Sequence, residues 1–350
     1  MKHACSALCA AVLFFSGCSE RKAPEPAGIP QEPKRVTIGF SLDSLIVERW
    51  IRDRDVFVST ASSLGADVIF QNAANNPSAQ VAQVKYLIDK GVDVLVIIPQ
   101  NAEMLAESVQ KARSRGIKVI SYDRLIRNAG VDLYISVNSM EVGRIMASAI
   151  IREAPAGNYV FIYGPKSDYN VTLVQEGLRS VFVQYPGIFH LLDFHAENWS
   201  YDLAFEQVSA LLEQGKAIDA IVCGNDGLAG GAIRALSEWR LAGEIPVVGQ
   251  DADIAACQYV VEGSQLATVY KPISALAREA AVQAVALADG SFTAPSDSIF
   301  DGVQDVPVMW FQPVEVNRDN IDEIIIRSGF HSANEIYRNI PANKRPPEHQ

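Results

Sequence analysis

The chain has 350 residues, of which 49% are hydrophobic and 20% are charged, and its formal net charge is −11 at pH 7. These values are ordinary for a globular protein, and the length suits about two domains. An acidic chain in which no basic patch stands out is not expected to bind nucleic acid.

The N-terminal segment is expected to be a signal sequence rather than part of the fold. Lys2 precedes an apolar run, residues 4–15, that is too short to span a bilayer. The run closes on Ser-Gly-Cys at 16–18, a pattern similar to a bacterial lipobox, although Phe15 stands where Leu is usual. That resemblance implies cleavage before Cys18 and lipidation of Cys18, which would anchor the protein to a membrane. The alternative is an ordinary signal peptide with a chance cysteine.

A Pro-rich, flexible tether is predicted next, over residues 18–34. Cys5 and Cys9 lie in the segment that cleavage would remove, so only Cys223 and Cys257 remain in the folded part beyond the tether. Two cysteines do not make a disulfide framework, and their apolar neighbours favour buried thiols. Whether the two residues pair is left open.

The first part of the fold alternates short apolar runs with amphipathic helical patterns. Strands are predicted at 36–40, 67–71, 92–98 and 118–122, and helices at 47–64, 77–90 and 103–115. Gly65, Gly91 and Gly116 follow these helices, as expected of residues that end a helix. Strands linked by helices through short connections are typical of βαβ units and a parallel sheet.

The same alternation restarts after a strand at 133–137. Further strands are predicted at 159–163, 189–194, 220–223, 247–249, 267–270 and 306–310, helices at 140–154, 171–185, 203–214, 228–239 and 273–289, and a last amphipathic piece at 321–327. Two similar α/β halves predict two lobes with a cleft between them. The Pro-rich, charged tail from residue 341 is expected to be frayed.

Several features that common enzymes need are missing. The five histidines include no HExxH pair, and none lies near a cysteine cluster, which argues against a zinc site. The run Gly224–Gly231 lacks the Lys-Ser/Thr of a P-loop and has the wrong glycine spacing for a dinucleotide turn. No G-x-S-x-G nucleophile elbow is present. We therefore expect neither catalysis nor a bound metal or cofactor.

Polar and aromatic side chains follow the predicted strands. Asp123 and Arg124 come directly after the strand at 118–122. Others that follow strands are Arg49, Trp50, Asn138, Asp168, Asn170, Asn198, Trp199, Asn225, Asp226, Gln250, Asp251 and Lys271. Ligands of open α/β sheets bind beyond the carboxyl ends of the strands. Carboxylates, amides and cations beside two tryptophans suit a sugar, whose hydroxyls need donors and acceptors and whose C–H faces pack on aromatic rings.

Each of these residues also has a purely structural interpretation. Asp123 and Arg124 could form a surface salt bridge, and Trp50 could belong to the core. Asn, Asp and Lys at such positions are often helix caps or solvated surface groups, which applies to Asn225, Asp226, Asp251 and Lys271. Only their joint placement at strand ends favours a binding site.

Several motifs resemble those of a known family. They are Glu-Arg-Trp at 48–50, Arg-Asp at 54–55, Gly-Val-Asp-Val-Leu-Val-Ile-Ile-Pro at 91–99, Tyr-Asp-Arg at 122–124, Asn-Asp at 225–226, Gly-Gln-Asp-Ala-Asp at 249–253, Thr-Val-Tyr-Lys-Pro-Ile at 268–273 and Gly-Phe-His at 329–331. Together they resemble the D-xylose-binding proteins of bacterial ABC sugar importers, within the type I periplasmic sugar-binding family. The resemblance covers residues 36–331.

The resemblance implies an α/β fold of two Rossmann-like lobes with parallel sheets, joined by three crossings. We place the crossings near Asn138, near 271–272 and near 308–311. The implied division is a signal peptide at 1–17, a tether at 18–34, a first lobe at 35–137 and 273–307, a second lobe at 138–272 and 308–332, and a tail at 333–350.

The family's binding site carries over onto ten residues. They are Arg49, Trp50, Asp123, Arg124, Asn138, Asn170, Trp199, Asn225, Asp251 and Lys271. By resemblance, the two tryptophans sandwich a pyranose and the other side chains bond its hydroxyls. Val137 stands where the xylose-binding pattern has an acidic residue, and the segment 163–170 also departs from that pattern. Both departures bear on which aldose is bound.

The function implied is that of a monomeric, lipid-anchored receptor outside the cytoplasm. It would capture an aldose, D-xylose first among them, and hand it to an ABC permease. A sensory subunit that reports sugar occupancy to a membrane histidine kinase or chemoreceptor would have the same site. A repressor of the same fold would need a helix-turn-helix where a signal sequence is expected here, and an enzyme would need a nucleophile or metal constellation.

Overall fold

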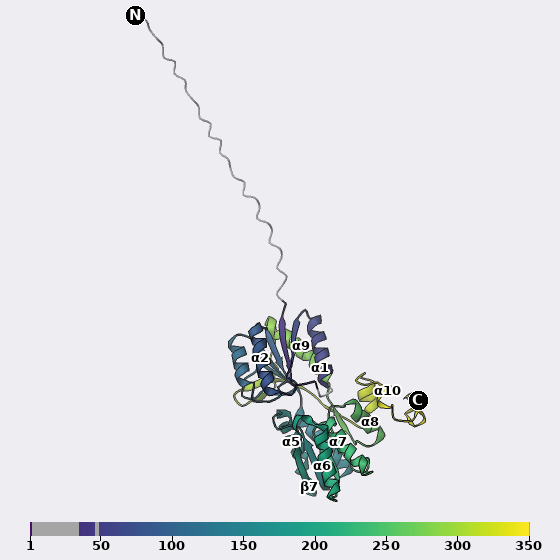
Figure 1. Cartoon of the computed structure of the whole chain (residues 1–350). Coiled ribbons are helices and arrows are strands. Elements are labelled where there is room, and N and C mark those ends of the chain that lie inside the picture. Colours follow the sequence, from purple (N-terminus) through teal and green to yellow (C-terminus); the bar gives the residue numbers. More distant parts are fainter. Residues whose placement is uncertain (2–34, 46–48, 350) are drawn as a thin grey trace. The chain divides into compact units, whose positions relative to one another are not determined.

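The computed structural model describes residue 1, residues 35–45 and residues 49–349 (Figure 1). The predicted signal segment and tether, including Cys18, lie outside the described residues. Residues 35–350 form one compact unit. Within the described ranges, no helix combines the length and the apolar character that crossing a membrane requires.

The first lobe is built on a seven-stranded sheet in the order β11-β12-β5-β4-β3-β1-β2. The strands are β1 (Thr37–Leu42), β2 (Asp67–Asn72), β3 (Val94–Ile97), β4 (Lys118–Tyr122), β5 (Leu133–Val137), β11 (Ser298–Phe300) and β12 (Asp305–Phe311). All neighbours pair in parallel except β11 and β12. The carboxyl ends of β1, β3 and β4 therefore meet at one edge, as the strand-end prediction requires.

Helices cover both faces of this sheet (Figure 1). They are α1 (Arg49–Ser63), α2 (Pro77–Lys90), α3 (Ala106–Ser114) and α9 (Ile273–Asp289). On one face Phe40 packs against Phe57 of α1, with ring centroids 4.4 Å apart. On the other face Val84 of α2 and Val109 of α3 belong to a separate buried cluster. Strands buried on both faces explain the continuous apolar runs in the sequence.

The second lobe has a parallel four-stranded sheet in the order β7-β6-β8-β9. Its strands are β6 (Gly157–Tyr163), β7 (Ile188–His195), β8 (Ala220–Cys223) and β9 (Val247–Val248), and its helices are α4 (Ser139–Glu153), α5 (Tyr169–Phe182), α6 (Tyr201–Glu213) and α7 (Asp226–Glu238). Phe161 of β6 shares a cluster with Leu178 of α5, whereas its neighbour Ile162 shares one with Leu228 of α7. Alternate residues of β6 thus face opposite helix layers.

The chain passes between the lobes three times. Asn138 links β5 to α4, and Lys271 with Pro272 links β10 (Thr268–Tyr270) to α9. Residues 308–311, near which the third crossing was predicted, pair with β5 in the first sheet. The crossing follows at 312–313, before β13 (Val314–Val316) pairs with β10. Residues 308–311 therefore belong to the first lobe, not to the second.

Other differences from the predicted elements lie near the C-terminus. Among the described residues, the α-helices α8 (Ile254–Glu262) and α10 (Ala333–Ile336) and the strands β11 and β13 were not predicted, nor were three short 3-10 helices. The predicted tail is not free, because Ile336 and Tyr337 are buried beside α8, and His349 Nε2 lies 3.1 Å from Asp322 Oδ2. The amphipathic piece at 321–327 is a π-helix, Asp322–Ile326.

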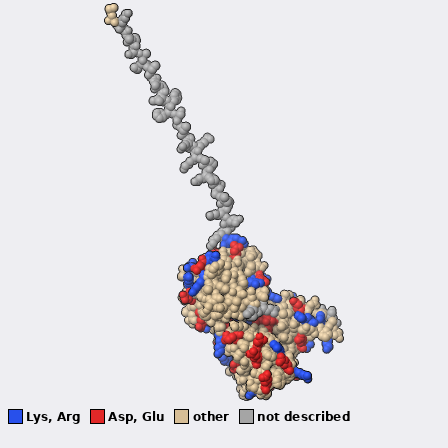
Figure 2. Space-filling model, in the orientation of Figure 1, with Lys and Arg blue, Asp and Glu red and all other residues tan. Residues whose placement is uncertain are grey.

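The described surface carries charges of both signs. Figure 2 shows acidic and basic side chains side by side on the face drawn. Cys223 and Cys257 are both buried, as their apolar neighbours predicted. Burial raises the pKa of the Cys223 thiol, which keeps it protonated and unreactive.

Candidate functional site

One cavity gathers strand-end residues of both lobes. Its free space is only about 30 Å³, far below the roughly 300–1,000 Å³ common for small-molecule sites, so its walls lie close together. The cavity is lined by Arg49, Trp50, Asp123, Arg124, Asp168, Asn170, Trp199, Asn225, Gln250, Asp251 and Lys271. Nine of the ten predicted site residues are among them.

Arg49, the first residue of α1, lies at the centre of a buried group of carboxylates. Its NH2 atom is 2.8 Å from Asp123 Oδ2 and 3.3 Å from Asp53 Oδ1, and its NH1 atom is 3.9 Å from Asp251 Oδ1. The Tyr122 hydroxyl donates a hydrogen bond to Asp53. A planar guanidinium can serve several carboxylates at once, which fixes its orientation in the cavity wall.

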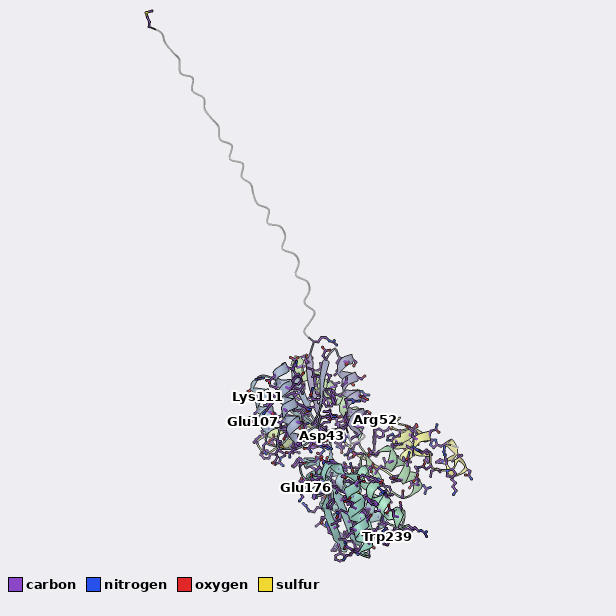
Figure 3. The ribbon with its side chains drawn as sticks, in the orientation of Figure 1. Asp43, Arg52, Glu107, Lys111, Glu176 and Trp239 are labelled. Atoms are coloured by element: carbon purple, nitrogen blue, oxygen red, sulfur yellow. The ribbon has the colours of Figure 1, made fainter. Side chains whose placement is uncertain are left out.

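Arg124 links the lobes through two carboxylates. Its NH1 atom lies 2.6 Å from Asp43 Oδ2 in the first lobe, and its Nε atom lies 2.6 Å from Asp168 Oδ2 in the second. Figure 3 labels Asp43, which follows β1. Burial raises the pKa of Asp43 and of Asp168 and outweighs the opposing effect of Arg124. The three groups share few solvent contacts, so each depends on the others for charge compensation.

Asp123 is bound from both lobes through its backbone. Its carbonyl oxygen accepts hydrogen bonds from Tyr134 Oη at 3.0 Å, from Ser136 Oγ at 2.6 Å and from Asn170 Nδ2 at 3.0 Å. Asn170 belongs to the first turn of α5 in the second lobe. These contacts hold the Asp123 carboxylate at the cavity wall, where it also meets Arg49.

Asp251 and Lys271 form the wall next to a crossing. Lys271 Nζ lies 2.9 Å from Asp251 Oδ1, and both side chains are at least nine-tenths buried. Burial alone would raise the pKa of Asp251, but Lys271 and Arg49 outweigh burial and lower it. Asp251 is therefore an ionised hydrogen-bond acceptor at neutral pH.

Two tryptophans complete the lining. Trp50 is 2% exposed, and the guanidinium carbons of Arg49 and Arg124 lie 4.3 Å and 5.4 Å from its ring centroid. Its Nε1 has no hydrogen-bond partner among the described residues. Trp50 is thus a core residue as well as a cavity residue.

Trp199 is half-buried and packs closely on two glycines. A Cβ atom on Gly164 would lie 2.3–2.5 Å from three atoms of the Trp199 ring, and one on Gly224 would lie 3.2 Å from it. Only a residue without a side chain lets the indole lie flat at position 164. Asn198 and Trp199 both have left-handed backbones, with φ of 55° and 56°.

Asn138 is the predicted site residue that is not part of the lining. Its side-chain oxygen accepts a hydrogen bond from Glu141 N at 3.1 Å and caps α4. Asn225 lines the cavity and also caps α7, because its Oδ1 accepts from Leu228 N at 2.9 Å. The capping interpretation therefore holds for Asn225 without removing it from the cavity.

Two lining residues, Asp168 and Gln250, were not among the ten, although both follow strands. Asp168 also caps α5, since its Oδ1 accepts from Asn170 N at 2.9 Å. Gln250 Nε2 donates to Gly224 O, while its Oε1 has no partner within the described part of the chain. Their placement after strands was the signal that would have found them.

The arrangement can bind a small polyhydroxylated molecule without reacting with it. Asp123, Asp251 and Asp168 offer acceptors, Arg49, Arg124 and Lys271 offer donors, and the indoles offer apolar faces. Over the described residues, no group of three or more His, Cys, Asp or Glu side chains could hold a metal ion.

Comparison with known proteins extends this description. The D-xylose-binding periplasmic protein of Escherichia coli strain K12 is 41% identical over 307 residues, which cover 87% of this chain and 93% of that protein. The multiple sugar-binding periplasmic receptor of Rhizobium radiobacter is 28% identical over 326 residues, 86% of this chain and 92% of that one. A solved ABC transporter solute-binding protein from Clostridium phytofermentans, with bound β-D-glucose, matches with a TM-score of 0.77 and 25% identity over 86% of this chain and 99% of that chain.

A family model for the periplasmic binding protein domain matches residues 38–291. The match spans parts of both lobes and two of the three crossings. Together with the two-lobed parallel α/β architecture, it shows that the chain belongs to the periplasmic binding protein family and has its type I fold.

Proposed function

We propose that this protein binds an aldose, D-xylose first, in the cavity between its lobes and delivers it to an ABC importer. The observation that carries the proposal is the cavity itself, where nine predicted strand-end residues from both lobes converge. Hydrogen bonds inside a closed, water-poor cavity are stronger than on the surface, so closure would favour a ligand rich in hydroxyls.

The relatives support this choice of ligand. The protein from Escherichia coli is named for D-xylose, and the solved structure from Clostridium phytofermentans holds β-D-glucose. Glucose differs from xylose by one hydroxymethyl group, and the 41% identity to the protein named for D-xylose makes the smaller sugar the better candidate. We assign the ten predicted residues as the binding set, with Asp168 and Gln250 added and Asn138 acting through the cap of α4.

We also propose that the mature chain is a monomer tethered to the membrane through a lipid on Cys18. The sequence Ser-Gly-Cys at 16–18 carries this part of the proposal. A Cys18→Ser chain should move from the membrane to the soluble fraction and lose labelling by radioactive palmitate. Labelling that persists in the variant would contradict it.

Titration calorimetry of residues 35–350 with xylose, glucose, galactose, ribose and arabinose tests the ligand. We expect tight binding of xylose and weak or no binding of the rest. Trp199→Ala should weaken xylose binding at least tenfold, because the sugar loses its aromatic face. Trp239→Ala is the matched control, since Trp239 is 49% exposed and lies away from the cavity (Figure 3). No binding of any aldose would overturn the ligand assignment.

A sensory role is the second candidate, favoured by the likeness to a protein named as a receptor. Binding alone does not separate the two roles, because the site is the same. Uptake of radioactive xylose by cells that lack this chain does. Loss of uptake supports transport, whereas normal uptake with a lost transcriptional response to xylose supports sensing.

A further inference from the structure

Asp226 is a buried carboxylate outside the cavity lining. It stands in the first turn of α7, next to Asn225, and is 4% exposed. Three side-chain or backbone donors reach it: Thr268 Oγ1 at 2.6 Å and Asp253 N at 3.1 Å bind Oδ2, and Gln265 Nε2 at 2.8 Å binds Oδ1. Every one of these donors comes from a segment that follows α7 in the chain.

Asp226 contacts residues 249–253, the segment between β9 and α8, most directly. A Cβ on Gly249 would lie 2.3 Å from Asp226 Oδ1, so the carboxylate needs a glycine there to approach the backbone. Asp251 and Ala252, the next residues, have positive φ values of 107° and 54°. Non-glycine residues in such conformations are strained and persist only where their surroundings hold them.

Thr268 connects Asp226 to this strained backbone through hydrogen bonds. Its hydroxyl donates its one proton to Asp226 and accepts the N–H of Ala252 at 3.1 Å. Asp253 N binds Asp226 directly, and His331 Nε2 lies 2.9 Å from Ala252 O. The backbone just after Asp251 is thus fixed at consecutive amides, while Asp251 N itself donates to Val269 O at 2.9 Å.

We propose that Asp226 and Thr268 are positioning residues for sugar binding, because they set the backbone from which Asp251 reaches Lys271 and Arg49. The inference rests on the proposed function, since it assigns these residues to the same site. A carboxyl group suits the role better than an amide, because three donors point at its two oxygens and an Asn side chain would turn its NH2 group toward at least one of them.

The test compares Thr268→Val with Thr268→Ser in the full chain. Valine keeps the shape and removes the hydroxyl, whereas serine keeps the hydroxyl. The rate of amide hydrogen exchange in residues 249–253, measured without ligand, reports how firmly this loop is fixed. Calorimetry with xylose reports the effect on binding affinity. We expect T268V to exchange at least tenfold faster over this segment and to bind xylose at least tenfold more weakly, and T268S to stay within twofold on both.

A double variant of Thr268 and Asp251 distinguishes a positioning role of Thr268 from a contribution to overall stability. In an Asp251→Asn background, T268V should weaken xylose binding by no more than twofold, because the group that it positions is already changed. A purely structural Thr268 would lower the melting temperature of T268V and leave loop exchange and affinity as in the parent chain, which overturns the proposal. Additive losses in the double variant also overturn it.

Two further outcomes remain decisive. Should T268V fail to fold, Asp226→Asn takes its place in the same two measurements, with the same expected changes. Should the parent chain bind no aldose, the proposed function fails, and the exchange of residues 249–253 still decides whether the hydroxyl holds the loop.

Discussion

Arg124 Nε lies 2.6 Å from Asp168 Oδ2, and these two buried groups come from different lobes. Arg124 follows β4 of the first sheet, and Asp168 precedes α5 in the second lobe. With Asn170 Nδ2 on Asp123 O and Ala102 N on Ser167 O at 3.0 Å each, the pair marks a closed conformation in which the cavity is shut from one side.

Replacing Asp168 by Asn should weaken xylose binding about tenfold or more. The change leaves buried Arg124 with one carboxylate instead of two, and a hydrogen bond to a charged group is worth about 1.5–3 kcal/mol. Calorimetry gives the affinity, and small-angle scattering should show a larger radius of gyration without ligand. Glu176→Gln is the control, because Glu176 is exposed on α5 (Figure 3). Unchanged affinity and radius together would falsify this role.

A methyl group at position 164 should disturb the site without unfolding the protein. Gly164→Ala puts a Cβ within 2.3–2.5 Å of the Trp199 ring, so the indole must move. We expect xylose binding to weaken at least tenfold, with altered tryptophan fluorescence. At Gly227 of α7, the nearest atom to an added Cβ is 3.5 Å away, so Gly227→Ala should leave binding intact. Equal effects of the two changes would count against the close packing of Trp199.

Arginine and lysine should not be interchangeable at position 49. Arg49 meets Asp53, Asp123 and Asp251 and stacks on Trp50, and one ammonium group cannot span these partners. Arg49→Lys should weaken xylose binding at least tenfold and lower the melting temperature. Arg54→Lys, on the same helix, changes an exposed pair with Asp55 and should shift stability by less than about 0.5 kcal/mol. Parent-like affinity in Arg49→Lys would remove Arg49 from the binding set.

Asp301 should contribute stability that depends on pH. Its carboxylate accepts from four backbone amides, Ala129, Gly130, Val303 and Gln304, at 2.6–3.1 Å. Burial opposes ionisation, but these donors outweigh it and lower the pKa below the ordinary 3.8. We expect Asp301→Asn to lower the free energy of unfolding at pH 7 by about 2 kcal/mol.

The sign of the pH effect follows from the lowered pKa. The native state releases the proton more readily than the unfolded chain, so this stability is complete above pH 3.8 and is lost as the pH falls through the native value. Urea unfolding should therefore show the gap between parent and Asp301→Asn narrowing below pH 4. Exposed Asp297→Asn is the control, and a constant gap would contradict the prediction.

The sequence predicted best where local chemistry defines an element. The bounds of α2 are those predicted, because Asn76 caps its start, with Oδ1 accepting from Ala79 N at 2.9 Å, and Gly91 ends it at φ 71°. The strand β4 was equally clear, since it is an apolar run that stops at Asp123. Short elements such as β11 and β13, with three residues each, carry too little pattern to be recognised.

The features that the sequence did not reveal depend on contacts between distant parts of the chain. The sequence gives no exact place for the third crossing, because nothing in residues 308–311 reveals that they pair with Tyr134–Val137. Asp168 was noted among the polar residues that follow strands, but the family resemblance did not place it in the site. It caps α5, and only the fold brings it to Arg124.

The double pairing of Arg124 bears on how quickly a bound sugar can leave. When the lobes part, Arg124 keeps Asp43, and Asp168 keeps the amide of Asn170. Neither charge is then stranded without a partner, so opening avoids the large penalty of an isolated buried ion. The lobes can therefore close firmly and still open often, which suits a protein that must release its bound sugar.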